Sequence, residues 1–165
     1  MKARYCILLM LVVSSCSNAP ELAATRTGHE GELMPSFRIL QPDSILYSTV
    51  DHAVGRPSLL FYFLPTCPYC RMEMRRIVNN MDKLKGMDFI VVTTAGYLDM
   101  YEFYKEYRIE KYRNVRMGLD MEGFFASYFM ANNVPFLAIY DRHKKLKSSY
   151  NGAMETEQLV KMVGL

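Results

Sequence analysis

The chain has 165 residues, of which 50% are hydrophobic and 13% aromatic, so it is long enough for one domain with a substantial core. Its formal net charge is +3 and no stripe of basic residues is present, which argues against nucleic-acid partners. The four cysteines are too few for a small domain that is held together by several disulfides.

Residues 1–15 have the pattern of a bacterial signal peptide. Lys2 and Arg4 form a short basic region, and the apolar segment that follows, residues 6–13, is about half as long as a membrane-spanning helix. The run Val13-Ser14-Ser15-Cys16 resembles the lipobox of bacterial lipoproteins, which implies cleavage before Cys16 and lipidation of its sulfur. The alternatives are an ordinary signal peptide and an uncleaved anchor. Loss of the two basic residues leaves 18 basic and 17 acidic residues, a net charge of about +1.

The segment after the leader is small and polar, with two glycines and a proline. We therefore expect residues 16–33 to be a flexible tether that carries the lipid at Cys16. Residues 34–165 are expected to form the domain.

Strand and helix patterns alternate along this domain. They predict, in chain order, a hairpin over 37–40 and 45–50, a strand over 59–64, a helix over 68–84, a strand over 89–93, a helix over 98–109, a short edge strand over 115–117, a helix over 122–130, a strand over 135–140, an edge strand over 145–150 and a helix over 157–163. Helices between strands imply parallel pairing, and the closing strands add antiparallel pairs. The prediction is an α/β domain with a mixed sheet flanked by helices. The helix over 68–84 is expected to place Met72, Ile77, Met81 and Leu84 near one face.

A pair of cysteines lies where the strand over 59–64 meets the next helix, in the run Cys67-Pro68-Tyr69-Cys70. Pro68 suits the first position of a helix, where the missing N–H costs nothing. A thiol at a helix N-terminus lies near the positive end of the helix dipole, which favours the nucleophilic thiolate. Two residues between the cysteines close too small a loop to stabilise the fold, so the pair is interpreted as a redox centre.

Four features together resemble the thioredoxin fold, and more narrowly the extracytoplasmic thiol–disulfide oxidoreductases of the TlpA/ResA kind, which are redoxins. They are Met34-Pro35-Ser36-Phe37 before the hairpin, the strand, Cys-x-x-Cys and helix at residues 59–74, Asn133-Val134-Pro135-Phe136 before a strand, and the closing strands and helix from Asp141. Residues 96–120 resemble the αβ unit inserted in that family. The resemblance implies a lipoprotein outside the cytoplasm that exchanges disulfides with cysteines of envelope proteins, with a membrane redox relay as its second partner and no cofactor beyond the Cys67–Cys70 disulfide. The direction of electron flow stays open.

The resemblance also implies roles for individual residues. Cys67 would be the attacking thiolate, and Cys70 the buried thiol that resolves a mixed disulfide. Pro135 would be a cis-proline that faces the thiols, with the Val134 backbone presented to an extended substrate segment. Pro68 and Tyr69 would shape the turn and the substrate groove.

Two positions depart from plain thioredoxins. The buried Asp six residues before the first cysteine is replaced by Phe61, and the Trp just before that cysteine is replaced by Thr66. No carboxylate is therefore visible that would accept the proton of Cys70. Water, or a carboxylate from elsewhere in the fold, would have to do so.

Other functions of the cysteine pair are less well matched. A zinc site needs four ligands, and neither a second cysteine pair nor a nearby histidine is present. A thiol peroxidase of this fold would carry Thr or Ser three residues before its reactive cysteine, where this chain has Leu64. A Cu(I) chaperone of this fold would use Cys-x-x-x-Cys, which is one residue longer. An inert structural disulfide is a further alternative. No metal ligand is predicted.

Overall fold

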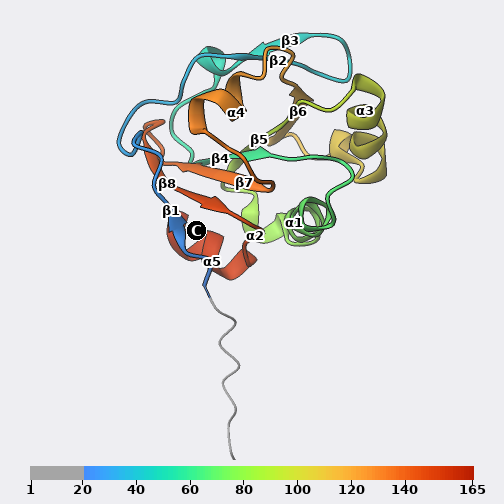
Figure 1. The fold of residues 1–165 in the computed structure, drawn as a ribbon. Coiled ribbons are helices and arrows are strands. Elements are labelled where there is room, and N and C mark those ends of the chain that lie inside the picture. The colour runs from blue at the N-terminus through green and yellow to red at the C-terminus, as the bar shows by residue number, and fades with distance from the viewer. Residues whose placement is uncertain (1–20) are drawn as a thin grey trace, which may run out of the picture.

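The computed structural model of the protein describes residues 21–165, which fold around an eight-stranded mixed sheet (Figure 1). The strands are β1 (Ala24–Thr25), β2 (Arg38–Leu40), β3 (Leu46–Ser48), β4 (Ser58–Tyr62), β5 (Asp88–Thr93), β6 (Val115–Leu119), β7 (Phe136–Tyr140) and β8 (Leu146–Asn151). The α-helices are α1 (Pro68–Asn79), α2 (Met81–Leu84), α3 (Tyr97–Glu106), α4 (Phe124–Phe129) and α5 (Thr156–Val163), and short 3₁₀ turns cover Thr49–Asp51 and Ile109–Lys111.

The sheet combines a parallel centre with antiparallel flanks. Its strand order is β1-β8-β7-β4-β5-β6-β2-β3, in which β4, β5 and β6 run parallel and every other neighbouring pair is antiparallel. Helices α1 and α3 connect the parallel strands, as crossover connections require. The predicted fold class is confirmed: this is the thioredoxin-like mixed sheet, with an N-terminal hairpin of β2 and β3.

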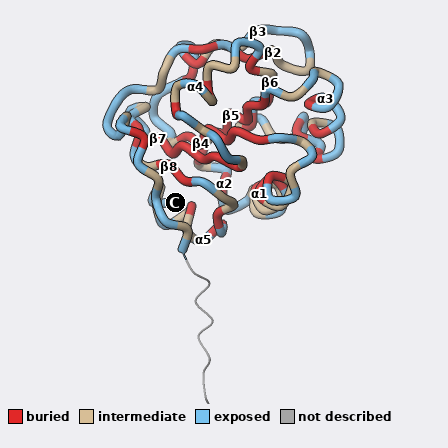
Figure 2. Tube along the Cα trace, viewed as in Figure 1, coloured by how far each residue is buried: buried red, intermediate tan, exposed pale blue. Residues whose placement is uncertain are grey.

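The central strands are buried on both faces, as Figure 2 shows for β4, β5 and β7. One face packs against α1, α2, α3 and α5 through a cluster that includes Phe61, Ile77 and Leu159. The opposite face packs against α4 and the hairpin through an aromatic cluster that includes Phe125 and Tyr140. Both-sided burial explains why these strands are continuous apolar runs rather than alternating ones.

The inserted unit consists of α3, the 3₁₀ turn at Ile109–Lys111 and β6. The prediction of an edge strand over 115–117 is wrong, because β6 lies inside the sheet between β5 and β2. Gly118 permits this neighbour: a Cβ atom at that position would lie 2.9 Å from side-chain atoms of Ile39 and from the carbonyl oxygen of Leu40. The hairpin can therefore cover β6 only because residue 118 has no side chain.

The expected flexible tether is wrong for residues 21–33, which belong to the fold. Ala24 and Thr25 form β1 on the outer edge of β8, so the predicted edge strand over 145–150 is covered along part of its length. Further along, the Gly31 N–H donates to the Leu146 carbonyl at 2.8 Å. The polar composition of this segment did not predict its attachment, because main-chain hydrogen bonds hold it and these do not depend on the side chains. The leader at 1–15 and the lipidation residue Cys16 lie outside the described residues.

The helix predicted over 68–84 is divided at Asn80, whose backbone leaves the helical region (φ −113°, ψ 20°). The buried residues of α1 are Cys70, Glu73, Met74 and Ile77, so the predicted face is wrong for Met72, which is half-buried. The core stripe of α1 thus includes a carboxylate. Among residues 21–165, no helix is long and apolar enough to cross a membrane.

Candidate active site

Cys67 lies at the N-cap of α1, and Pro68 is the first residue of that helix. Strand β4 leads to this point through the buried Phe63 and a turn in which the Cys67 N–H donates to the Leu64 carbonyl at 3.0 Å. The Cys67 carbonyl accepts the first helical hydrogen bond, from Arg71 at 3.0 Å. The Cys67 side chain is half-exposed and its thiol is free. The turn therefore presents this sulfur at the positive end of the α1 dipole.

The loop before β7 lies directly against Cys67. The Cys67 Sγ–H donates to the Val134 carbonyl at 3.7 Å, and the Val134–Pro135 peptide bond is cis. Pro135 is buried, and its carbonyl accepts a hydrogen bond from the Gly152 N–H at 2.8 Å. The structure thus brings Val134 and Pro135 next to Cys67, which precedes them by more than sixty residues in the sequence.

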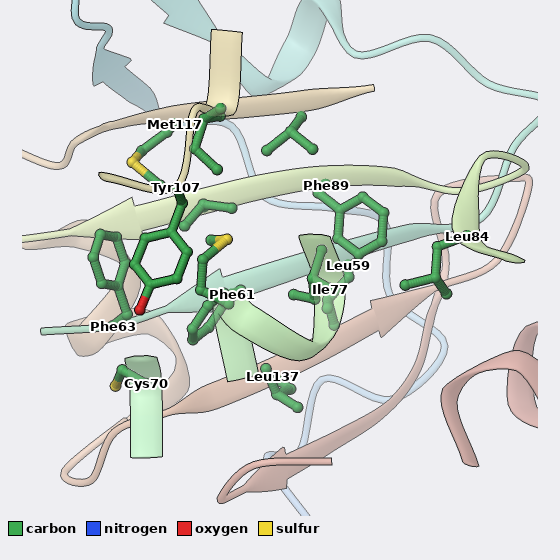
Figure 3. Close-up of a cluster of buried hydrophobic side chains, with 14 of the residues drawn as sticks. Leu59, Phe61, Phe63, Cys70, Ile77, Leu84, Phe89, Tyr107, Met117 and Leu137 are labelled. Carbon is green, nitrogen blue, oxygen red and sulfur yellow. The ribbon is translucent and has the colours of Figure 1, made fainter. Parts of the chain in front are cut away.

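Cys70 is one helical turn further along and is completely buried, with 0% of its surface exposed. Its side chain belongs to the same core cluster as Phe63 and Tyr107 (Figure 3). The pKa of the Cys70 thiol is raised to about 12, mainly by burial, and the neighbouring Cys67 and Glu73 contribute to this rise. The two thiols therefore differ in access: only Cys67 can meet a protein substrate.

Glu73 is a functional candidate that the sequence reasoning missed. Its side chain is 1% exposed, and burial raises the pKa of its carboxyl group to about 7. Its Oε2 accepts a hydrogen bond from the Met154 N–H at 2.7 Å, which acts in the opposite direction and favours the charged form. Glu73 shares the buried face of α1 with Cys70, which is three residues away, and the negative charge of Glu73 helps to raise the pKa of the Cys70 thiol. The available signal was a glutamate placed between Cys70, Met74 and Ile77 on an otherwise apolar stripe.

Arg71 fixes the loop that precedes the cysteines. Its guanidinium donates to the Pro65 carbonyl at 3.3 Å and pairs with Glu106 of α3 at 2.7 Å. It also lies over the Phe103 ring, 5.7 Å from the centroid. These contacts hold the start of α1 against the inserted unit. The positive charge of Arg71 is thereby paired with the Glu106 carboxylate of α3.

Pro68 and Tyr69, the residues between the cysteines, are exposed on the surface of the turn, and Tyr69 is 63% exposed. The Tyr69 ring borders a groove of about 480 Å³ that Val134 and Pro135 also line. Three of the predicted groove residues, Tyr69, Val134 and Pro135, thus line one groove, whereas Pro68 does not line it. Across residues 21–165, no three His, Cys, Asp or Glu side chains lie together in a group that could hold a metal ion.

The Redoxin family model matches residues 29–163 of the chain. Several solved structures have the same fold. DsbF of Mycobacterium tuberculosis has a TM-score of 0.66 at 21% identity, covering 78% of this chain and 92% of that one. A secreted disulfide oxidoreductase of the same organism, homologous to DsbE of E. coli, has a TM-score of 0.65 at 19% identity, covering 78% and 94%. The exposed lipoprotein thioredoxin of Streptococcus pneumoniae has a TM-score of 0.62 at 19% identity, covering 77% and 96%. No curated protein matches the chain significantly in sequence.

Proposed function

Because the chain belongs to the Redoxin family and is a thioredoxin-like oxidoreductase, we propose that it exchanges a Cys67–Cys70 disulfide with cysteines of other envelope proteins while tethered to a membrane. The observation that carries this proposal is the asymmetry of the two thiols. Cys67 is half-exposed at the start of α1, whereas Cys70 is buried one turn behind it. This arrangement suits one thiol that attacks a partner and a second that resolves the resulting bond.

In the reducing direction, the exchange proceeds in two steps. The Cys67 thiolate attacks one sulfur of a substrate disulfide, which forms a Cys67–substrate disulfide and releases the other substrate sulfur as a thiolate that takes up a proton. The Cys70 thiolate then attacks the Cys67 sulfur, which forms the Cys67–Cys70 disulfide and releases the second substrate thiolate. Two electrons and two protons pass to the substrate, and oxidation of a dithiol substrate reverses each bond change. The proposal includes no further cofactor, and a membrane redox relay would return the pair to its starting state.

The second step requires that Cys70 lose a proton, which its raised pKa of about 12 opposes. Glu73 lies on the same buried face of α1, and its pKa of about 7 makes it a suitable acceptor near neutral pH. We assign this carboxylate the transfer of the Cys70 proton toward solvent. The first step needs no such group, because Cys67 is open to water and lies at the helix N-terminus.

The substrate is proposed to lie as an extended segment across the loop at Val134. A backbone segment can pair with the Val134 main chain there and place its cysteine at Cys67, while Pro135, Pro68 and Tyr69 shape the surface around it. Lipidation of Cys16 would hold the domain at a membrane outside the cytoplasm. Cys16 lies outside the described residues, and the support for this part of the proposal is the leader sequence.

A trapping experiment tests the exchange. The Cys70→Ser variant, expressed with its leader, should accumulate mixed disulfides between Cys67 and envelope proteins, because the resolving thiol is missing. These adducts should disappear on reduction and should be absent from the Cys67→Ser variant and from the double variant. If Cys70→Ser forms no adducts, and the purified wild-type protein reduces no protein disulfide after treatment with dithiothreitol, the proposed function is wrong.

The membrane anchor is tested separately with the Cys16→Ala variant. The wild-type protein should fractionate with membranes and carry the mass of an acylated N-terminal cysteine. The variant should lack that mass and should leave the membrane fraction. Acylation absent from the wild-type protein would remove the anchor from the proposal and leave the exchange chemistry untouched.

A further inference from the structure

Residues 21–25, here called the N-terminal strap, are fastened to the surface beside the redox site. Gln158 of α5 holds the main chain of Leu22 on both sides: its Oε1 accepts from the Leu22 N–H at 2.9 Å, and its Nε2 donates to the Leu22 carbonyl at 2.9 Å. Ala24 and Thr25 then pair with β8, and Ser149 Oγ donates to the Thr25 carbonyl at 3.0 Å. The strap therefore has a defined position on the fold.

The strap forms one side of the groove of about 480 Å³ next to Cys67. Leu22 and Ala23 line it together with the α1 residues Tyr69 and Met72. Val134 and Pro135 also line it, and the Val134 carbonyl accepts the hydrogen bond from Cys67 Sγ–H. Leu22 also packs against the core and approaches Gly152 so closely that a Cβ there would lie 3.2 Å from its Cδ1. The volume is within the range of about 300–1,000 Å³ that is usual for sites that enclose a ligand.

The charged side chains that border this groove are already paired. Glu21 accepts from Lys161 at 3.0 Å, and Arg76 forms an ion pair with Glu155. A charged group that entered the groove would lose hydration and find no free opposite charge among these residues, whereas an apolar group would contact Leu22, Met72 and Pro135. The groove chemistry thus favours an apolar side chain.

We propose that the N-terminal strap is a specificity wall, and that the groove binds an apolar side chain next to the target cysteine in an extended segment of the substrate protein. This inference rests on the proposed function. The occupant follows from continuity with the redox site. A substrate bonded to Cys67 lies against Val134, and each residue next to its cysteine is only about 3.5 Å further along the extended chain. Leu22 supplies the contact, and Gln158 positions Leu22.

The test uses cysteine peptides, each joined by a disulfide to a small thiol, with Leu or Asp at the first or second residue on either side of the cysteine. The reduced protein should act on the best Leu peptide with a kcat/KM about tenfold higher than on its Asp counterpart, mainly through KM. The Leu22→Ala and Gln158→Ala variants should lose most of this preference. Leu98→Ala, the same change at a side chain that is 73% exposed on α3, should keep it. Rates with cystine serve as the reference, and circular dichroism checks that each variant is folded.

Two outcomes would overturn the inference, and they are distinguishable. If the wild-type protein reduces cystine and peptides but shows no preference, or if folded Leu22→Ala keeps the full preference, the strap is not a specificity wall and the proposed function stands. If the wild-type protein reduces neither cystine nor any peptide, the proposed function fails and the inference fails with it.

Discussion

Both ends of strand β4 lead to buried polar groups. At one end these groups are hydrogen-bonded to one another, and at the other they lie beside a reactive thiol. At the start of β4, His52 is enclosed between two hydroxyl groups: its Nδ1 lies 2.9 Å from Tyr47 Oη and its Nε2 lies 2.7 Å from Ser58 Oγ. Beyond the end of β4, Cys70 and Glu73 lie behind the half-exposed thiol of Cys67, whose hydrogen-bond acceptor, Val134, lines an open groove.

Burial suppresses the charged form at both ends, with opposite consequences for pKa. It lowers the pKa of His52 and raises the pKa values of Cys70 and Glu73. Both ring nitrogens of His52 have hydrogen-bond partners, so the first site can contribute stability. The second site places a titratable thiol and a titratable acid beside a reactive sulfur. A buried polar group therefore indicates a reactive site only when it lies beside a reactive group such as the Cys67 thiol.

The largest effect is expected for the attacking sulfur. Cys67→Ser should reduce disulfide exchange by at least about 1,000-fold, because no covalent intermediate can form without this thiol. The rate is measured by reduction of a fluorescent peptide disulfide. Ser58→Ala, at the other end of β4, is the matched control and should exchange at the wild-type rate. A Cys67→Ser variant with substantial exchange would assign the chemistry to another group.

The next effect concerns the proton acceptor. Glu73→Gln should slow resolution of a preformed Cys67 mixed disulfide by about 100-fold at neutral pH, the usual size of general-base catalysis. In the wild-type protein this rate should rise with pH through about 7, the pKa of Glu73, and the variant should lose that inflection. Stopped-flow release of the substrate thiol measures both. An unchanged pH profile in Glu73→Gln would mean that water alone accepts the proton.

The enclosed histidine should matter for stability only. His52→Ala leaves the Ser58 hydroxyl buried without its partner and removes a packed ring, so unfolding in urea should cost about 2 kcal/mol less than in the wild-type protein. Disulfide exchange by the folded variant should be unchanged. A loss of exchange in folded His52→Ala would show that the two ends of β4 are coupled.

The last predictions concern the pH dependence of stability, which should have opposite signs at the two sites. The folded protein keeps a proton on Glu73 that the unfolded chain releases above about 4.5, so this group lowers stability as pH rises from about 4.5 to about 7. For His52 the folded pKa is lowered, so its contribution is present above about 6.5 and is lost as pH falls.

Urea unfolding across this pH range measures both contributions. Relative to the wild-type protein, Glu73→Gln should become more stable as pH rises through this window. His52→Gln should become relatively more stable as pH falls below about 6.5. Parallel pH profiles for the three proteins would contradict the burial argument at both sites.

The sequence was sufficient for features that local patterns encode. The apolar run into Cys-Pro-Tyr-Cys, with Pro68 ready to begin a helix, predicted the strand, the turn and the helix start. The features it missed depend on tertiary contacts. Glu73 was not recognised because a glutamate in a helix is normally exposed, and only the packing of α1 shows that this one is buried. The strap was missed because its attachment relies on the side chain of Gln158, which is 136 residues away from Leu22.

Attachment of the strap also limits how far the redox site can travel. If residues 16–33 were all free, a lipid at Cys16 would let the domain move up to about 60 Å from the bilayer, at about 3.5 Å for each residue. With Leu22 held on α5, only the five peptide units from Cys16 to Glu21 are left, which span at most about 18 Å. On the proposed lipidation, the protein would therefore work within a thin layer above the membrane. Reactive cysteines held far above the bilayer would be out of its reach.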